Sequence, residues 1–162
     1  MMKLITSPNP ILKQIAEPWD FEKDSDAKAV EQDMLALMKT FNGRGLAGNQ
    51  AGLLKRVFVM KLDNGQEFAL FNPEIVSIDD TKVEGEEGCL SFPNLWLKVK
   101  RSKTLTAKYL DTDGKECIIE LTGMDARCFQ HELDHLNGIC FTDGLSPLKL
   151  ALEIKKQRKR KW

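Results

Sequence analysis

Both histidines of the chain stand in one short segment, Gln130-His131-Glu132-Leu133-Asp134-His135. His131 and His135 are four residues apart, so on a helix both imidazoles lie on one face, one turn apart, where they can bind one metal ion. Glu132 can then reach a water on that metal and exchange protons with it. The spacing therefore predicts a helix that carries two metal ligands and a proton-transfer residue.

A catalytic metal site typically takes three protein ligands and leaves one position open. Two residues could supply the third ligand. Cys89 stands in the segment Glu87-Gly88-Cys89-Leu90-Ser91, and Glu153 follows His135 by eighteen residues, roughly as in zinc proteases of the thermolysin type. We favour Cys89, because Glu153 fits a polar position on an amphipathic helix, with Lys149 as an ion-pair partner one turn before it.

The other three cysteines, Cys117, Cys128 and Cys140, complete no C-x-x-C pair of the kind found in structural zinc sites. Cys117 fits a strand and Cys140 fits the core. Cys128 precedes His131 by three residues and shares its helix face, either as core or as the wall of a pocket. The N-terminus has no apolar run long enough for a signal peptide. We therefore expect free thiols and a cytoplasmic protein.

A glycine-rich segment spans residues 43–52. Glycine lets the backbone approach a ligand closely and adopt conformations that other residues avoid. The segment lacks the G-K-[ST] ending of a phosphate-binding loop. Taken alone, it fits a flexible loop after a helix as well as it fits a binding loop.

Together, three segments resemble the signature motifs of the peptide deformylase family, in the family's order and at its spacing: Gly43-x-Gly45-Leu46-Ala47-x-x-Gln50, Glu87-Gly88-Cys89-Leu90-Ser91 and Gln130-His131-Glu132-x-Asp134-His135. The resemblance runs from Pro8 to Lys149. It implies a hydrolase that removes the N-formyl group from formylmethionine at the N-terminus of newly made polypeptides and releases formate. It also implies Fe²⁺ as the metal, replaceable by Ni²⁺, Co²⁺ or Zn²⁺.

The resemblance assigns roles to individual residues. It implies Cys89, His131 and His135 as metal ligands and Glu132 as the proton carrier. The Gln50 amide and the backbone N–H of Leu90 would stabilise the oxyanion of the tetrahedral intermediate. The substrate-binding residues that it implies are Gly43, Arg44, Gly45, Gly88, Trp96, Met124, Arg127 and Cys128.

Five residues depart from the family's usual pattern. Arg44 and Arg127 replace residues that are commonly aliphatic, Gly48-Asn49 replaces Ala-Pro or a similar pair, and Trp96 replaces a basic or polar residue at the mouth of the site. We expect Arg44, Arg127 and Trp96 to modify recognition of residues at and beyond methionine. Alternatively, both arginines extend their head groups into solvent on aliphatic stems.

The helices and strands expected around these motifs indicate an α+β fold, with antiparallel strands wrapped around a central metal-binding helix. Residues 24–26 fit the cap of an N-terminal helix that reaches Phe41. Strands are expected at 56–62 and 67–71, joined by a turn at Asn64-Gly65, at 95–100, and at 104–110 and 115–121.

The motif helix should begin near residues 122–125, where Thr122 and Asp125 fit a capping box, and end at Asn137-Gly138. Asp134 points away from the metal face on this helix. It either anchors the helix and orients a ligand, or is an exposed carboxylate. Ser146-Pro147 fits the start of a last helix.

Length and composition fit one catalytic domain over 1–162, with a C-terminal basic helix and tail at 147–162. Residues 155–161 hold six basic residues; without these six, acidic residues outnumber basic ones, 24 to 18. The separation of charge suggests an anionic partner for the tail. By the resemblance this is the ribosome, through phosphates of its RNA. The alternative is a solvated tail, and no membrane partner is expected.

Two other functions stay open at this point. The first is a zincin-type metallopeptidase that uses His131, His135 and Glu153. The second is a catalytically silent, metal-stabilised protein that binds the ribosome or RNA through its basic tail. Glu132 and Gln50 argue against the second function, because a purely structural metal site needs neither residue.

Overall fold

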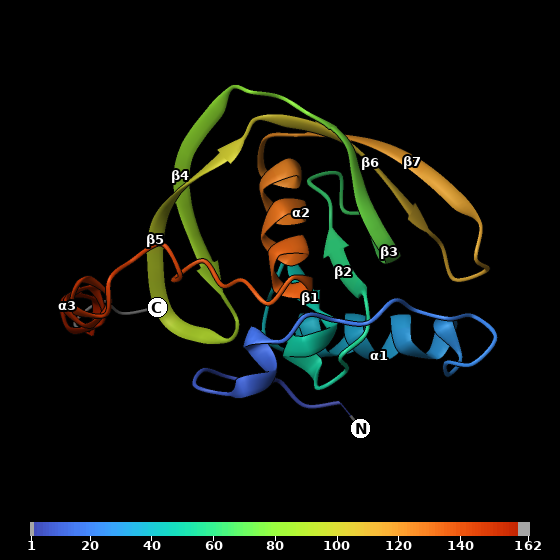
Figure 1. The fold of residues 1–162 in the computed structure, drawn as a ribbon, viewed down its shortest axis with the longest axis horizontal. Coiled ribbons are helices and arrows are strands. Elements are labelled where there is room, and N and C mark those ends of the chain that lie inside the picture. The colour runs from blue at the N-terminus through green and yellow to red at the C-terminus, as the bar shows by residue number, and fades with distance from the viewer. Residues whose placement is uncertain (1, 159–162) are drawn as a thin grey trace.

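A computed structural model describes residues 2–158 of the chain. Helix α2 (Gly123–Leu136) lies at the centre, with strands on several sides of it (Figure 1). The other elements are η1 (Pro10–Lys13), α1 (Ala27–Thr40), β1 (Gly45–Ala47), η2 (Gly48–Ala51), β2 (Val57–Lys61), β3 (Glu67–Ile78), β4 (Lys82–Cys89), β5 (Phe92–Ser102), β6 (Thr104–Leu110), β7 (Glu116–Thr122) and α3 (Pro147–Gln157). The predicted α+β fold, with strands around a central helix, is confirmed.

The strands form two antiparallel sheets. One sheet has the order β1-β2-β3-β6-β7, and the other is the pair β4-β5. In the first sheet, β2 and β3 are joined by the predicted turn, where Gly65 has φ 92° and so takes a conformation that favours glycine. Figure 1 shows the β4-β5 pair on the side of α2 opposite β3. Helix α2 is thus enclosed between the two sheets.

Strand β3 is longer than expected and has an irregular centre. Its first half pairs with β2 and its second half with β6, with a register shift between Phe71 and Glu74. Asn72 lies at the shift with φ 48°, and its side chain bonds the backbone N–H and carbonyl of Trp19. The predicted strand ends at Phe71, and the Asn72-Pro73 pair that follows is locally typical of a turn rather than of a strand.

Strand β4 was not predicted as a strand. Its sequence, Lys-Val-Glu-Gly-Glu-Glu-Gly-Cys, lacks the alternation of apolar and polar residues that marks a half-buried strand. It forms because each of its residues from Lys82 to Gly88 has a partner on β5. This pairing fixes where Glu87 and Cys89 stand relative to the central helix.

Helix α2 begins and ends close to the predicted residues, but its N-terminus is not a capping box. Thr122 is the N-cap and makes no side-chain cap bond. The Asp125 carboxylate accepts hydrogen bonds from the Asp63 N–H and from Arg44 Nη2 instead. At the other end, Asn137 caps the helix and Gly138 has φ 74°. The tertiary contacts of Asp125 thus override the local rule.

Two buried clusters hold α2 and α1 against the larger sheet. Phe129 of α2 packs edge-on against Phe58 of β2, with ring centroids 5.3 Å apart. Met34 and Met38 of α1 are fully buried against the other face of β2 and β3. Burying a methionine side chain contributes roughly 1.5–3 kcal/mol, so α1 is fixed firmly to the sheet that carries the glycine-rich segment.

The predicted caps of α1 and α3 are confirmed. Asp26 Oδ1 accepts from the Lys28 N–H, and Ser146 Oγ accepts from the Lys149 N–H. Helix α3 packs against β5, and residues 159–162 of the predicted basic tail lie outside the described residues. Within residues 2–158, no helix is both long enough and apolar enough to cross a membrane.

Candidate metal centre

Three predicted ligands converge between α2 and the end of β4. The Sγ of Cys89 lies 3.3 Å from the Nε2 of His135, and the Nε2 atoms of His135 and His131 are 3.2 Å apart. Bonds of about 2.0–2.3 Å around a tetrahedral ion would place ligand atoms roughly 3.3–3.6 Å from one another. The observed separations therefore fit one metal ion shared by a thiolate and two imidazoles.

Glu87 fixes the protonation of His131. Burial alone would raise the pKa of Glu87, but hydrogen bonds from Arg101 and His131 and their charges lower it to about 2. The carboxylate therefore accepts from Nδ1 of His131 at 2.8 Å, so Nδ1 carries the proton. In a neutral His131 the lone pair then stands on Nε2, which faces His135, the arrangement that a metal-binding histidine needs.

Arg101 connects this carboxylate to Asp134. Its Nε and Nη2 donate to the two oxygens of Glu87 at 2.8 and 2.9 Å, and its Nη1 donates to Asp134 at 2.6 Å. Asp134 therefore anchors the motif helix, as one of the two sequence interpretations had it. It is not a free surface carboxylate. The sequence placed Glu87 in a motif without a role and did not indicate Arg101, because their meeting depends on the register of β4 against β5.

Glu132 is buried beside the candidate ligands. Its Oε1 is one of the buried side-chain atoms without a hydrogen-bond partner among the described residues, and its Oε2 faces Gly45 across the site. Burial raises the pKa of Glu132 to about 7, partly offset by the charge of His131. A carboxyl group with such a pKa can take up and release a proton near neutral pH.

Gln50 is held in one orientation. Its Oε1 accepts from the Ala47 N–H at 2.9 Å, which directs Nε2 toward Ser91 Oγ at 3.0 Å and Cys89 Sγ at 3.4 Å. The amide donor therefore lies beside the candidate thiolate ligand. Leu90 follows Cys89 directly and packs against Gly43, where a Cβ would come within 2.6 Å of it. Gly43 thus permits a close approach of the glycine-rich segment.

Glycines also bring two predicted substrate-binding groups close to the site. A Cβ on Gly45 would lie 2.5 Å from Glu132 Oε2 and 2.8 Å from Cys128 Sγ, so Cys128 is a wall of the site. A Cβ on Gly88 would lie 2.8 Å from the indole of Trp96. The glycines therefore leave room for Glu132 on one side and for Trp96 on the other.

The other predicted substrate-binding residues, and the rival ligand Glu153, differ in exposure and in their hydrogen-bond partners. Arg44 Nη2 pairs with Asp63 at 2.7 Å, and Met124 is 46% exposed at the start of α2. Arg127 is only 7% exposed and donates to Glu87, so the expectation that both arginines extend into solvent is wrong for Arg127. Glu153 accepts from Gln157, without the expected ion pair to Lys149.

Asn49 adds a connection that the sequence did not indicate. Asn49 belongs to the pair Gly48-Asn49, which differs from the family's usual pattern. Its side-chain amide donates to the backbone carbonyl of His135. A Cβ on Gly48 would lie 2.6 Å from the Leu53 carbonyl, which explains the glycine. This short helical turn therefore supports the C-terminal half of the motif helix.

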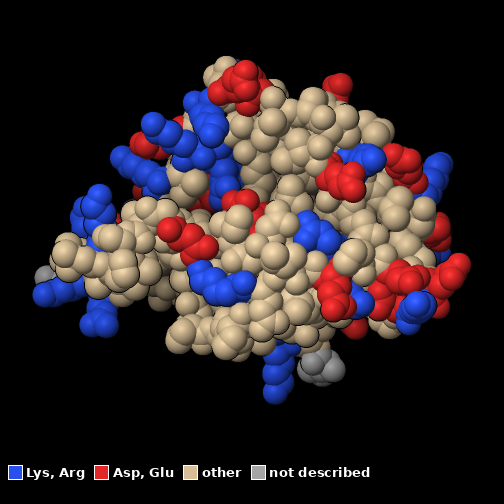
Figure 2. Space-filling model, in the orientation of Figure 1, with Lys and Arg blue, Asp and Glu red and all other residues tan. Residues whose placement is uncertain are grey.

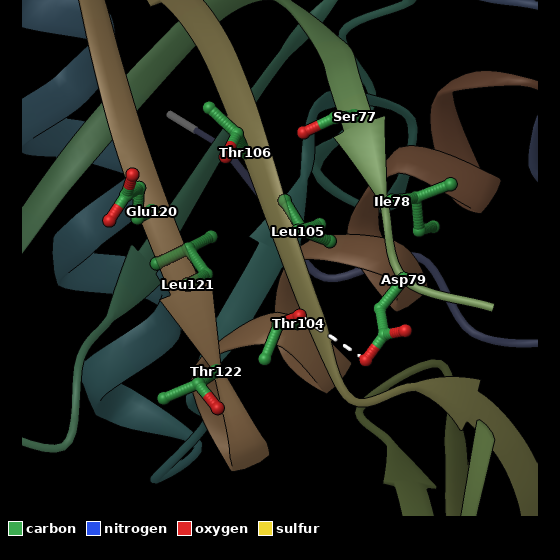
Figure 3. A pocket seen from close by; sticks show the side chains of 9 residues that line it. All are labelled: Ser77, Ile78, Asp79, Thr104, Leu105, Thr106, Glu120, Leu121 and Thr122. Carbon is green, nitrogen blue, oxygen red and sulfur yellow. Dashed lines mark hydrogen bonds between the residues drawn. The ribbon is translucent and has the colours of Figure 1, made fainter. Parts of the chain in front are cut away.

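A separate hollow of about 590 Å³ lies over the ends of β3, β6 and β7 (Figure 3). Serine, threonine, acidic and apolar side chains line it, the apolar ones being Ile78, Leu105 and Leu121, and Thr104 Oγ1 donates to Asp79. A second hollow, of about 540 Å³, includes Gly43 and Arg44. The first hollow contains none of the predicted site residues.

Known proteins match almost the whole chain. The family model described as polypeptide deformylase matches residues 1–151. A peptide deformylase of Thermotoga sp. is 43% identical over 91% of this chain and 89% of its own length, and one of Maricaulis maris is 41% identical over 97% and 92%.

Solved structures of peptide deformylases also superpose on almost the whole chain. The crystal structure of a Thermotoga maritima peptide deformylase superposes with a TM-score of 0.84, at 41% identity, over 91% of this chain and 99% of that one. The Ehrlichia chaffeensis enzyme in complex with actinonin has a TM-score of 0.88, at 36% identity, and both chains are covered to 99%.

Proposed function

Because the chain belongs to the peptide deformylase family, we propose that Cys89, His131 and His135 hold its metal ion and that Glu132 moves the proton of the reaction. The chain is a metal-dependent hydrolase that removes the N-formyl group from formylmethionine at the N-terminus of newly made polypeptides. The observation that carries the residue assignment is the convergence of one sulfur and two Nε2 atoms, all within 4.8 Å of one another.

A divalent ion held by these three side chains supplies Lewis acidity, which lowers the pKa of a water and polarises a carbonyl oxygen. Glu132 accepts the proton of the water that attacks the formyl carbon. The C–N bond of the formamide then breaks, and Glu132 delivers the proton to the departing nitrogen. The oxygen of the water ends in formate, and the peptide leaves with a free amino group.

We propose that Gln50 and Leu90 stabilise the oxyanion. The Gln50 carbonyl is held by the Ala47 N–H, so its Nε2 is already directed at the site before substrate arrives. The Leu90 N–H follows Cys89, where the β4–β5 register shifts. Donors that are oriented in advance stabilise developing charge without reorganisation.

The side chain of methionine and the residues after it would be bordered by the substrate-binding set Gly43, Arg44, Gly45, Gly88, Trp96, Met124, Arg127 and Cys128. We expect Arg44 and Trp96 to alter preference beyond methionine. Values of kcat/KM across a panel of formylated peptides test this for Arg44→Ile and Trp96→Arg. A preference that stays the same in both variants contradicts it.

We propose Fe²⁺ as the metal, replaceable by Ni²⁺, Co²⁺ or Zn²⁺. A mixed thiolate and imidazole set suits these ions, and a thiolate beside ferrous iron predicts inactivation by oxygen. Metal analysis of protein purified without oxygen tests the identity of the ion. Purified protein that contains zinc and is indifferent to air would contradict iron.

The ligand set itself is tested by two variants. Cys89→Ser should abolish tight Ni²⁺ binding, whereas Glu153→Ala should leave it unchanged, because Glu153 pairs with Gln157 on α3. Intact binding in Cys89→Ser together with loss in Glu153→Ala would favour the zincin-type peptidase instead.

We further propose one catalytic domain over 1–162, a cytoplasmic location and docking on the ribosome through the basic tail. Figure 2 shows Lys and Arg side chains gathered over the end of the molecule formed by β4, β5 and α3. Such a surface suits salt-dependent contacts with RNA phosphates. A chain that ends at Gln157 should lose ribosome binding at low salt, and retained binding would refute docking through the tail.

A further inference from the structure

Arg127 makes a buried clamp between the motif helix and the smaller sheet. Its Nη1 donates to Glu87 Oε2 and to the Val99 carbonyl, both at 2.8 Å, and its Nη2 donates to the Val83 carbonyl at 2.6 Å. Val83 belongs to β4 and Val99 to β5. One guanidinium therefore ties α2 to both strands of the pair and to the carboxylate between them.

Gly85 provides the space for this guanidinium. A Cβ at Gly85 would lie 3.0 Å from Nη2, 3.1 Å from Cζ and 3.3 Å from Nε of Arg127. Gly85 stands between Val83 and Glu87 on β4, and alternate residues of a strand share one face. A side chain at position 85 would therefore push directly on the group that bonds Glu87.

Glu87 needs donors on both of its oxygens to keep its orientation. Oε1 accepts from Arg101 Nη2 and from His131 Nδ1, and Oε2 accepts from Arg101 Nε and Arg127 Nη1. Arg101 is also bonded to Asp134. Arg127 and His131 thus bind the two oxygens of Glu87 from the same helix, one turn apart.

We propose that Arg127, admitted by Gly85, is a positioning residue for His131 and acts through Glu87. Partners of a ligating histidine set its tautomer and ring orientation, and their loss typically weakens metal binding by about 10–100-fold. Arg127 is one hydrogen bond further from the metal site than Glu87. Its removal should therefore weaken metal binding by about 5–20-fold. The proposal rests on the proposed function, because it takes His131 as a metal ligand.

Co²⁺ binding tests this with a readout other than turnover. The full-length protein is titrated with Co²⁺ against a chelator, and the visible spectrum of bound Co²⁺ reports the geometry of its ligands. Arg127→Met keeps an unbranched, largely apolar stem and removes the guanidinium with all of its donors. Arg56→Met is the matched control, because Arg56 also bonds a backbone carbonyl of α2, that of Leu136, together with the Ala16 carbonyl, and makes no hydrogen bond to Glu87.

We expect Arg127→Met to weaken Co²⁺ binding about 5–20-fold and to change the Co²⁺ spectrum, with Arg56→Met within about twofold of wild type. Arg127→Lys should lie in between, because it keeps the charge without the planar fork. In a Glu87→Gln background, Arg127→Met should add less than about twofold, because residues that act through one another are not additive.

Gly85→Ala tests the other half of the pair. It should displace the guanidinium by a few tenths of an ångström and weaken Co²⁺ binding, and it should add nothing when Arg127 is already replaced by methionine. Co²⁺ affinity and spectrum like wild type in Arg127→Met, or an undiminished effect in the Glu87→Gln background, would overturn the proposal. Failure of the wild-type protein to bind Co²⁺ would instead overturn the proposed metal site.

Discussion

Replacing Glu87 with glutamine should destabilise the protein by an amount that depends on pH. The neutral amide would imitate the protonated carboxyl group and remove the negative charge that two arginines and His131 surround. Glu87 is only 5% exposed, so solvent screens these contacts little. A pKa near 2 in place of 4.5, at about 1.4 kcal/mol for each pKa unit, corresponds to about 3 kcal/mol of folding free energy.

The direction of the pH dependence follows from the sign of this change. The pKa of Glu87 is lower in the folded chain than in the unfolded chain, so its stabilisation is present above about pH 4.5 and is lost as the pH falls toward 2. The difference between wild type and Glu87→Gln should therefore be about 3 kcal/mol at pH 7 and roughly half of that or less at pH 3.

Urea unfolding of the metal-free proteins at pH 7, 5 and 3 measures this difference. Glu116→Gln is the control, because Glu116 is an exposed residue of β7 and should change stability by less than about 0.5 kcal/mol. The stabilising role of the Glu87 charge would be contradicted if Glu87→Gln lowered the free energy of unfolding by less than about 1 kcal/mol at pH 7. An equal loss at pH 3 and pH 7 would contradict it as well.

Three further predictions concern the glycines and the metal. Gly45→Ala should reduce kcat for formate release by about 100-fold or more, because the new Cβ would displace Glu132; activity near wild type would show that Glu132 has room to move. Gly138→Ala should cost about 1–3 kcal/mol in urea unfolding, since Gly138 has φ 74° and a Cβ would lie 2.6 Å from the Lys13 carbonyl oxygen; an unchanged midpoint would contradict this. Removing metal with a chelator should lower the Tm, and Co²⁺ at about 100 times its Kd should restore about 2.7 kcal/mol; a Tm that does not respond would argue against a metal tied to the fold.

The sequence was sufficient for the chemistry that is local. His131 and His135 meet because four residues span one helical turn, and no tertiary information is needed to see that. The alternation of side chains and the Asn64-Gly65 turn likewise indicated the β2–β3 hairpin. Cys89 came from its motif and from the weakness of Glu153 as a rival ligand.

The contacts around Glu87 could not be predicted from the sequence. They require β4, whose glutamates and glycines show no strand period, and they require its register against β5. Asp125 failed as a capping residue for the same reason, since its carboxylate has a distant partner in the Asp63 N–H. Local sequence rules fail where a side chain forms a more favourable contact with a residue that is distant in the sequence.

We propose Glu132 as the proton carrier when this chain deformylates peptides. The most direct test compares formate release from a formyl-Met tripeptide by wild type and Glu132→Gln, both loaded with Ni²⁺ and checked for metal content. We predict rapid release by the wild type, with kcat at least about 100-fold lower in the variant at equal metal content. No formate from folded, metal-loaded wild type would contradict the assigned reaction, and equal rates would contradict the role of Glu132.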